Sequence, residues 1–370
     1  MTVSVVIIGG GYGGISLAKA LDDAVDVVLV DPKDSFVHSV AALRSLVNKE
    51  WSERIFFRYD GLLRRGRVVR DRAVKINSQG ATTAGGQRID ADYVVLASGS
   101  SYPFPAKMDV DDTAEALTKL AATREQLASA SRVLLVGAGP VGLELAGEIT
   151  DVWPDKEVTI VDVADNILSG AYSPELRECL RRQLEERGVR LVLGAPLAEE
   201  ITVVPGVNVP FSVSTTAGVE IDADIWFRCY GVVPQSDYLS GELLSARRPD
   251  GFIDVDDRLR VAGHDNVFAI GDVTGIAEPK RAAAAEHHAQ VVADIILALA
   301  QGRVPEATYR PGPDGVLIPL GATGGAGQIP IAEATVIGPE QTAQFKGRDL
   351  MVGHYAELFG GNGSSQIPGS

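Results

Sequence analysis

The stretch VVIIGGGYGG at residues 5–14 decides the fold, and the chain repeats its pattern as LLVGAGPVG at residues 134–142. In each copy, aliphatic and β-branched residues lead into G-x-G-x-x-G and then into a helical pattern. The first glycine permits a tight turn, the second lets the backbone approach a pyrophosphate, and the third lets the helix pack close to the strand. Two copies in this context predict that one chain binds two dinucleotides.

Each motif opens a predicted βαβ unit whose second strand ends on an aspartate. These residues are Asp31 and Asp162, and a carboxylate there can bind the ribose hydroxyls of a dinucleotide. The alternative for Asp31 is a chance aspartate in the turn before Pro32. Asp162 is followed by Val163 and Ala164, with no Arg or Lys to accept a 2′-phosphate, so we expect NADH to be preferred over NADPH.

Composition bounds the class of protein. The 370 residues suggest roughly two to three domains. With 45% hydrophobic residues and 40 glycines, the chain has the composition of a soluble α/β protein. The net charge of −15 argues against nucleic acid as a partner, because phosphate binding requires clustered Lys and Arg.

Cysteines and targeting signals narrow the class further. Cys179 and Cys229 lie far apart, and the absence of C-x-x-C predicts neither a redox disulfide nor a metal site. Because the first ten residues already read as a strand, we expect no leader, and with Thr2 after the first methionine we expect no N-myristoylation. The longest apolar run, at residues 291–300, is too short to span a bilayer. We therefore expect a cytoplasmic protein without a membrane span.

Two further segments identify the first nucleotide as FAD. YVVLASGSS at residues 93–101 is a strand that ends at Ser98 and Gly99, where a close turn lets a returning chain pass the cofactor. NVFAIGDVTG at residues 266–275 ends a strand on Gly271 and Asp272, and a carboxylate there can bind the ribityl chain of a flavin. The alternative for Asp272 is an ordinary cap of the following turn. The short alternating runs at residues 67–76 and 92–99 predict a small β-meander that closes the first unit near Gly99.

The order of these motifs resembles the flavoprotein oxidoreductases with two dinucleotide-binding domains, the fold of glutathione reductase. Within them the chain is most similar to the apoptosis-inducing-factor-like group, and particularly to NAD(P)H:quinone oxidoreductases of the ferroptosis-suppressor type. The segments that carry this resemblance are VDPKDSFVHSVAALR (30–44), PFPAK (103–107), GLELAGEI (142–149), GHDNVFAIGD (263–272), PK (279–280) and KGRDL (346–350).

The resemblance implies an α/β fold with two Rossmann-like dinucleotide-binding domains and a small C-terminal α+β domain. The FAD-binding domain would be discontinuous, over residues 1–108 and 247–303, with the NAD(H)-binding domain at 109–246. Residues 304–370 would form the C-terminal domain, and we expect its polar end, GGNGSSQIPGS, to be disordered.

The resemblance also implies roles for individual residues of the FAD site. The pyrophosphate would be held by the first glycine loop, which consists of Gly9, Gly10, Gly11, Tyr12, Gly13 and Gly14. Asp31 would bind the adenosine ribose and Asp272 the ribityl chain. Arg44 matches a family arginine that touches the cofactor, and Val68 matches a β-meander position that contacts the adenine through its backbone. The alternatives are a solvated helix end for Arg44 and ordinary strand core for Val68.

On the nicotinamide side, the resemblance assigns the second pyrophosphate to the second loop, with its glycines Gly137, Gly139 and Gly142. Glu144 matches a family glutamate that orients the nicotinamide, although an acid in the first turns of a helix is also favoured by the helix dipole. Lys280 and Lys346 would place positive charge near the flavin, with surface lysine as the alternative for both. His38 could relay a proton near neutral pH, or be a satisfied, partly buried histidine.

These residues together predict an FAD-dependent oxidoreductase that takes hydride from NADH and passes electrons to a small-molecule acceptor, a quinone. Disulfide reductases of this fold carry C-x-x-C after the second strand, where this chain reads FVHSVAALRS, so the electrons would leave the flavin directly. The alternatives are a reductase of a small redox protein such as a ferredoxin, and a flavin-bound sensor of NADH.

Relatives of this group bind membranes through an amphipathic C-terminal helix or a myristoylated N-terminal glycine. Neither feature is visible in this sequence, so we expect at most weak peripheral membrane contact. The oligomeric state stays open.

Overall fold

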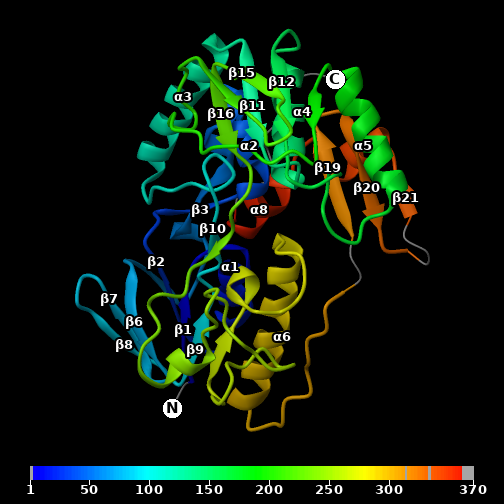
Figure 1. Cartoon of the computed structure of the whole chain (residues 1–370). Helices are drawn as coiled ribbons and strands as arrows, with labels where there is room; N and C mark the ends of the chain where they lie inside the picture. The colour runs from blue at the N-terminus through cyan, green and yellow to red at the C-terminus, as the bar shows by residue number, and fades with distance from the viewer. Residues whose placement is uncertain (1–2, 313–314, 332–334, 361–370) are drawn as a thin grey trace.

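A first parallel sheet forms around the N-terminal motif. The computed structural model describes residues 3–312, 315–331 and 335–360 (Figure 1). In sheet order the strands are β18 (Val267–Ala269), β9 (Tyr93–Leu96), β1 (Ser4–Ile8), β2 (Asp26–Asp31) and β5 (Arg67–Arg70). All four pairings are parallel, which brings the carboxyl ends of these strands to one edge of the sheet.

Both faces of this sheet are buried, because side chains alternate along β1. Val5 and Ile7 pack toward α1 (Tyr12–Leu21) and α6 (Ala282–Ala300), two helices in contact with each other. Val6 and Ile8 point to the opposite face. That face is covered by an antiparallel meander of β6 (Ala73–Asn77), β7 (Gly80–Thr83) and β8 (Arg88–Asp90). The near-continuous hydrophobic run of β1 follows from this two-sided burial.

The meander differs from the sequence prediction. Residues 67–70 form the parallel edge strand β5, in which Val68 pairs with Leu29, and the run at 92–99 contains β9, a neighbour of β1. Only residues 73–90 form the meander. Short apolar runs carry no signal that separates a parallel strand from a meander strand, so the expectation that Val68 belongs to a β-meander is wrong.

The second parallel sheet repeats the first on a smaller scale. Its order is β13 (Arg190–Val192), β12 (Glu157–Val161), β11 (Arg132–Val136) and β16 (Ile225–Arg228). The helices of this unit are α3 (Thr113–Ser129), α4 (Pro140–Val152) and α5 (Pro174–Glu186). The hairpin of β14 (Phe211–Ser214) and β15 (Glu220–Ala223) covers the face on which Leu134 and Trp226 lie.

The chain leaves the first unit and returns to it along a short two-stranded ribbon. β10 (Ser100–Ser101) leads out and pairs with β17 (Val233–Pro234), which leads back. Leu239, Leu243 and Ala246 then pack into the core cluster that contains Val6 and Ile8 of β1. The expected boundary between residues 246 and 247 therefore lies inside a packed stretch of the first unit.

The C-terminal segment packs against the second unit and then returns to the first. Strands β19 (Val316–Leu320), β20 (Gly324–Ile329) and β21 (Thr335–Ile337) form an antiparallel sheet that contacts α4 and α5. A short helix α7 (Pro339–Thr342), a π-helical turn (Ala343–Gly347) and helix α8 (Val352–Leu358) follow. Tyr355 of α8 belongs to the core cluster of the first unit. The tail expected to be disordered lies, from residue 361 on, outside the described residues.

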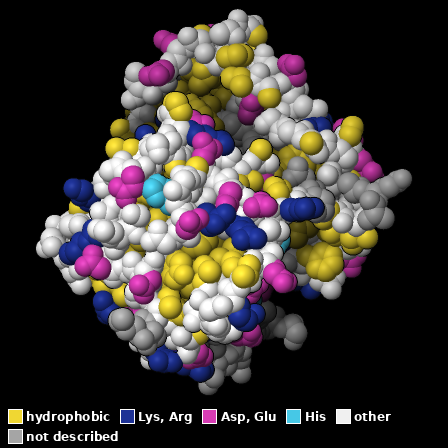
Figure 2. Space-filling model, turned by 90° about the horizontal axis from the view of Figure 1, so that it is seen from below, with side chains coloured by type: hydrophobic (Ala, Val, Ile, Leu, Met, Phe, Trp, Pro, Cys, Tyr) yellow, Lys and Arg dark blue, Asp and Glu magenta, His cyan; other side chains and the backbone are white. Residues whose placement is uncertain are grey.

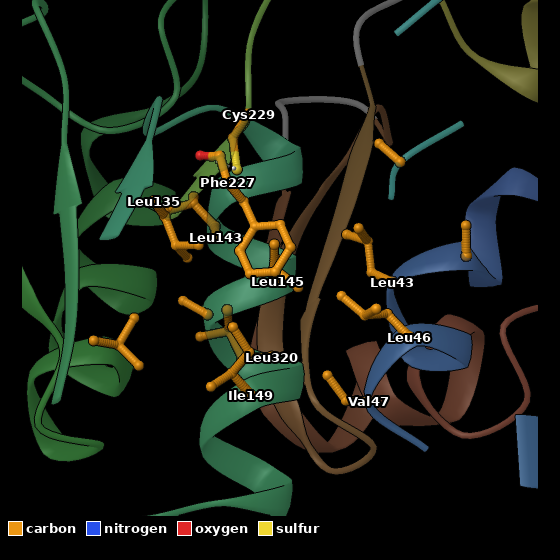
Figure 3. Packing of buried hydrophobic residues seen from close by; sticks show 14 of the residues in the cluster. Leu43, Leu46, Val47, Leu135, Leu143, Leu145, Ile149, Phe227, Cys229 and Leu320 are labelled. Atoms are coloured by element: carbon orange, nitrogen blue, oxygen red, sulfur yellow. Dashed lines mark hydrogen bonds between the residues drawn. The ribbon is translucent and has the colours of Figure 1, made fainter. Parts of the chain in front are cut away.

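One hydrophobic core joins all three parts. Helix α2 (Ala42–Val47) lies in the connection between the paired strands β3 (Ser35–Val37) and β4 (Phe56–Arg58), and it contacts α4 of the second unit. Figure 3 shows Leu43 and Leu46 of α2 on one side of this core, with Ile149 of α4 and Leu320 of β19 on the other. The two units with parallel sheets and the C-terminal sheet therefore do not have fully separate cores.

The surface carries charge of both signs. Figure 2 shows Lys and Arg side chains lying beside Asp and Glu on the face seen from below, with hydrophobic side chains gathered between them. Over the described ranges, no helix is both long and apolar enough to cross a bilayer. The apolar run at residues 291–300 is the C-terminal part of α6, whose buried positions face the first sheet.

Candidate functional site

The first and third glycines of each motif are required by packing. Gly9 and Gly137 have φ of +106° and +116°, a region that glycine alone enters readily. A Cβ on Gly9 would lie 2.5 Å from the carbonyl oxygen of Ala97, and a Cβ on Gly14 would collide with the carbonyl oxygen of Gly9. Gly142 is blocked in the same way by Gly137. These positions bring each helix against its strand.

The second glycine of each motif faces open space instead. A Cβ on Gly11 or on Gly139 would meet no atom within 4 Å, although both stand at the N-terminus of a helix. Free backbone N–H groups and the helix dipole make such a position suited to a phosphate group. The two loops therefore fit two dinucleotide pyrophosphates, with the backbone left bare where the ligand would approach.

The two aspartates at the ends of β2 and β12 have matching environments. Oδ2 of Asp31 accepts a hydrogen bond from the amide of Gly10 at 2.6 Å, and Oδ2 of Asp162 accepts one from Ala138 at 2.5 Å. In each case the amide two residues beyond the aspartate donates to Oδ1 at 2.8 Å. Burial raises the pKa of Asp31 above its ordinary value. Each carboxylate thus joins the glycine loop to the strand end where a ribose would lie.

Asp272 lies at the carboxyl edge of the first sheet, just after β18. Its Oδ2 accepts hydrogen bonds from Ser100 Oγ at 2.6 Å and from Lys107 Nζ at 3.0 Å. Burial acts to raise the pKa of Asp272, but the charge of Lys107 and the Ser100 hydrogen bond outweigh it, and the pKa is lowered. Among the described residues, Oδ1 accepts no hydrogen bond, so it is available to a polyol hydroxyl.

Lys107 is a site residue that sequence reasoning missed. Its ammonium binds Ser100 through both the carbonyl and the hydroxyl oxygen at 2.8 Å, in addition to Asp272. Lys107 ends the PFPAK segment, so a signal was present in the sequence. That signal could not show the partner, because Asp272 is 165 residues away.

The turn at Ser98 and Gly99 contacts the chain that returns from the second unit. Gly99 has φ of +65°, and no atom lies within 4 Å of the position that its Cβ would take. Ser98 Oγ donates to the carbonyl oxygen of Gln235 at 2.5 Å and lies 2.5 Å from the hydroxyl of Tyr238. The turn is therefore held by the segment that follows β17.

Two predicted site residues of different units form an ion pair. Lys346 Nζ lies 2.8 Å from Glu144 Oε1 and donates to the carbonyl oxygen of Leu317 at 3.1 Å. The two side chains are 19% and 14% exposed, which leaves the pair partly accessible. Lys346 lies in the π-helical turn, and such turns are frequent at functional sites. The pair joins α4 of the second unit to the C-terminal segment.

His38 is fully buried between the first unit and the C-terminal segment. Its Nε2 lies 2.6 Å from the carbonyl oxygen of Leu350, which can only accept, so Nε2 carries the proton. Nδ1 lies 3.1 Å from the hydroxyl of Tyr12 and accepts from it. Burial is the main cause that lowers the pKa of His38, to about 4. These contacts favour the alternative of a satisfied, buried histidine over a proton relay near neutral pH, because desolvation disfavours the imidazolium.

Lys280 binds the backbone of its own loop. Its Nζ donates to the carbonyl oxygens of Thr274 at 2.7 Å and of Ile276 at 3.0 Å. Burial lowers the pKa of Lys280, while the charge of Glu278 acts in the opposite direction. This lysine precedes α6 and supports the loop that follows Asp272, and the structure does not bring it into contact with Lys346.

Arg44 is a buried clamp between the three parts of the chain. It is 4% exposed, which contradicts the alternative of a solvated helix end. Its Nε and Nη2 donate to the Glu148 carboxylate at 2.7–3.0 Å. Nη1 donates to the carbonyl oxygens of Gly347 at 2.6 Å and Arg348 at 3.3 Å. The guanidinium that the resemblance assigned to the cofactor thus binds α4 and the segment after Lys346.

The described ranges show neither a metal site nor a redox-active pair of cysteines. No group of three or more His, Cys, Asp or Glu side chains there could hold a metal ion. Both cysteines are free thiols, and burial raises the pKa of Cys229 to about 12. The surroundings of Cys229 therefore do not favour a reactive thiolate at neutral pH.

Comparison with known proteins places this geometry in a family. The family model described as pyridine nucleotide-disulphide oxidoreductase matches residues 3–289. Ferroptosis suppressor protein 1 of Taeniopygia guttata is 32% identical over 359 residues, which cover 95% of this chain and 94% of the relative. Apoptosis-inducing factor homolog B of Dictyostelium discoideum is 29% identical over 368 residues, which cover 95% of each chain.

The fold is found in solved structures as well. Sulfide:quinone oxidoreductase of Aquifex aeolicus superimposes with a TM-score of 0.76 at 16% identity, and the match covers 99% of this chain and 93% of the other. At this identity the likeness concerns the fold alone. The comparisons confirm the resemblance and the fold class that the motifs predicted.

The Arg44 clamp generates a prediction about stability. Arg44→Met leaves the Glu148 carboxylate buried without its partner, and we expect it to lower the free energy of unfolding by about 3–5 kcal/mol. The double variant Arg44→Met, Glu148→Leu removes both charges, and we expect it to recover most of this loss. Urea denaturation of the flavin-loaded protein measures both. The exposed Arg58–Asp60 pair is the control, and Arg58→Met should change nothing measurable. A double variant as unstable as the single one would contradict the prediction.

The lowered pKa of His38 generates a second prediction. The native state takes up the proton only near pH 4, whereas the unfolded chain takes it up near pH 6.5. Stability is therefore fully present above about pH 6.5 and falls as the pH drops, by up to about 3 kcal/mol from this group. The variant His38→Asn should lack this part of the pH dependence. The measurement is the difference in unfolding free energy between the parent and the variant at pH 7.5 and 4.5, and a constant difference would refute the assignment.

Proposed function

This chain belongs to the pyridine nucleotide-disulphide oxidoreductase family and is an FAD-dependent NAD(P)H oxidoreductase, and we propose that it uses NADH and reduces a quinone-like acceptor. The observation that carries the proposal is the contact between Lys346 and Glu144, made where the two nucleotide-binding units and the C-terminal segment meet. The loop at residues 32–44 contains no cysteine, so no disulfide lies between the flavin and the acceptor in that segment.

The residues that would hold FAD are those of the first unit. The bare backbone at Gly11 suits its pyrophosphate, Asp31 its adenosine ribose, and the free Oδ1 of Asp272 its ribityl hydroxyls. When bound, FAD accepts hydride from the nicotinamide and releases electrons to the second substrate. The chain contributes alignment and charge to this chemistry rather than a covalent intermediate.

The residues that would hold NADH are those of the second unit. Gly139 leaves room for the pyrophosphate, and Glu144 stands one turn into α4 to orient the nicotinamide end. Asp162 faces the ribose position and would repel a 2′-phosphate there, while the neighbouring Val163 offers no compensating charge. This charge arrangement supports NADH as the donor.

Lys346 is the residue that would serve the acceptor. A quinone gains negative charge as it takes up electrons, and it also needs protons to become a quinol. The ammonium of Lys346 can stabilise that charge and supply a proton from Nζ, and Glu144 keeps the ammonium in place.

The acceptor could instead be a small redox protein. The net charge of −15 would repel an acidic ferredoxin, which argues for a small molecule. A flavin-bound sensor of NADH is the third reading, and it differs from the first two by the absence of turnover.

Anaerobic reduction and reoxidation distinguish these readings. We expect NADH to bleach the flavin absorbance within a single turnover, and we expect menadione or a short-chain ubiquinone to reoxidise it faster than oxygen or ferredoxin does. Stopped-flow absorbance of the flavin measures both half-reactions. Reoxidation only by a redox protein would favour the second reading. A long-lived reduced complex that no acceptor discharges would favour the third.

Cofactor preference is tested by kinetics with both nucleotides. We expect kcat/KM for NADH to exceed that for NADPH by about tenfold or more, because a 2′-phosphate would lie beside the carboxylate of Asp162. The double variant Asp162→Asn, Val163→Arg should reverse the order, and Val163 is 70% exposed, so an arginine fits there without disturbing the core. The single variant Val163→Ala is the matched control. Equal kcat/KM values in the parent would disprove the preference.

A further inference from the structure

The backbone of the turn that carries Asp272 is held from behind by a buried histidine. Gly271 has φ of +72° and is buried, and its N–H donates a hydrogen bond to Nδ1 of His288 at 2.9 Å. His288 lies on α6 and is 1% exposed. The carbonyl oxygen of Gly271 accepts from the amide and the hydroxyl of Thr274, so both backbone groups of Gly271 have partners.

This hydrogen bond selects one form of the imidazole. The Gly271 N–H can only donate, so Nδ1 must be unprotonated and the ring proton must lie on Nε2. Nε2 is 2.9 Å from Oε1 of Glu278, and among the described residues it makes no hydrogen bond. The carboxylate therefore attracts the protonated side of the ring, which leaves Nδ1 directed at Gly271.

A third residue fixes the carboxylate and the ring together. The hydroxyl of Tyr309 donates to Oε2 of Glu278 at 2.5 Å, and its ring lies edge-on to the His288 ring, 4.2 Å between centroids at 89°. Tyr309 comes from the extended segment after α6, and Glu278 from the loop before it. The segments that precede and follow α6 in the chain thus hold the His288 imidazole in one orientation.

The opposite side of the same turn is held by different residues. Ser100 and Lys107 bind Oδ2 of Asp272, and Oδ1 is left without a protein partner in the described part of the chain. The place of Oδ1 is thus determined by the backbone at Gly271 and by the contacts of Oδ2. A shift of the backbone would move Oδ1 even with Ser100 and Lys107 intact.

We propose that His288 is a positioning residue for the flavin: its Nδ1 holds the Gly271–Asp272 turn so that the Asp272 carboxylate meets the ribityl chain. The proposal rests on FAD binding by this chain and not on the identity of the electron acceptor. Without Nδ1 the buried Gly271 N–H has no acceptor, and the turn must move or admit water to satisfy it.

The test compares variants that keep or remove the acceptor. His288→Leu fills the space but accepts no hydrogen bond, and we expect FAD to bind about tenfold more weakly. In His288→Asn, the amide oxygen can take the place of Nδ1, and we expect binding within about threefold of the parent. Gln290→Leu is the control, because Gln290 is exposed on the same helix and its side chain donates to Asp294 rather than to the cluster, so it should have no effect.

The readout is flavin release from the full-length holoprotein, without NADH or acceptor. The dissociation constant of FAD follows from the recovery of free-flavin fluorescence on serial dilution, and circular dichroism checks that each variant is folded. His288→Leu with parental affinity would overturn the proposal, as would His288→Asn that loses as much affinity as His288→Leu. The latter result would mean that ring packing, and not the hydrogen bond, is what matters.

A second variant covers the case in which His288→Leu does not fold. Glu278→Gln keeps the shape of the cluster but removes the charge that holds the proton on Nε2, and we expect FAD to bind about two- to fivefold more weakly. Parental affinity in Glu278→Gln would then count against the proposal. A parent protein that binds no FAD would contradict the proposed function itself. A parent that binds FAD, with variants of unchanged affinity, would contradict only the role of His288.

Discussion

The close approach of each helix to its strand is the constraint on which both nucleotide sites depend. Gly14 and Gly142 lack a Cβ, and this lets the helix backbone press against the carbonyl oxygen of the first glycine in the same motif. The helix N-terminus is thereby brought to the end of the strand, beside the bare second glycine and the aspartate at the end of the neighbouring strand. A phosphate position with its dipole, amides and ribose partner follows from this one packing contact. The repetition of the contact explains why one chain has two such positions.

The two nucleotide sites can work together only if the two units keep a fixed relative orientation. Buried polar contacts between the units hold that orientation. The Arg44–Glu148 pair lies next to the shared hydrophobic core of α2, α4 and β19 seen in Figure 3. Arg44 also binds the carbonyl oxygen of Gly347, directly after Lys346, and Glu148 stands one helical turn beyond Glu144. In a core of low polarity such groups must be paired, so the arrangement has few alternatives. The Lys346–Glu144 contact is therefore set by the packing of three segments.

Two buried histidines, His38 and His288, act through hydrogen bonds and carry no charge. His38 is neutral because it is desolvated, and the Leu350 carbonyl holds the ring proton on Nε2 while Nδ1 accepts from Tyr12. His288 uses an unprotonated nitrogen to hold Gly271. In each case the histidine acts as a neutral hydrogen-bonding group in the frame of a binding site. Lys346 and Glu144 are titratable groups that remain partly accessible where the units meet.

The sequence alone determined the two βαβ units, the aspartates at their strand ends, the turn at Gly271 and Asp272, and membership of a flavoprotein family. Those features are local: a glycine at a positive φ, a strand followed by a helix, or a carboxylate at a strand end is encoded within about 30 residues. Tertiary structure alone decided that Val68 lies in a parallel edge strand, that Arg44 binds a glutamate 104 residues away, that Lys107 reaches Asp272 and that His38 is neutral. Pairing, desolvation and pKa depend on which distant segments pack together, and a short run of sequence carries no record of its partner across the core.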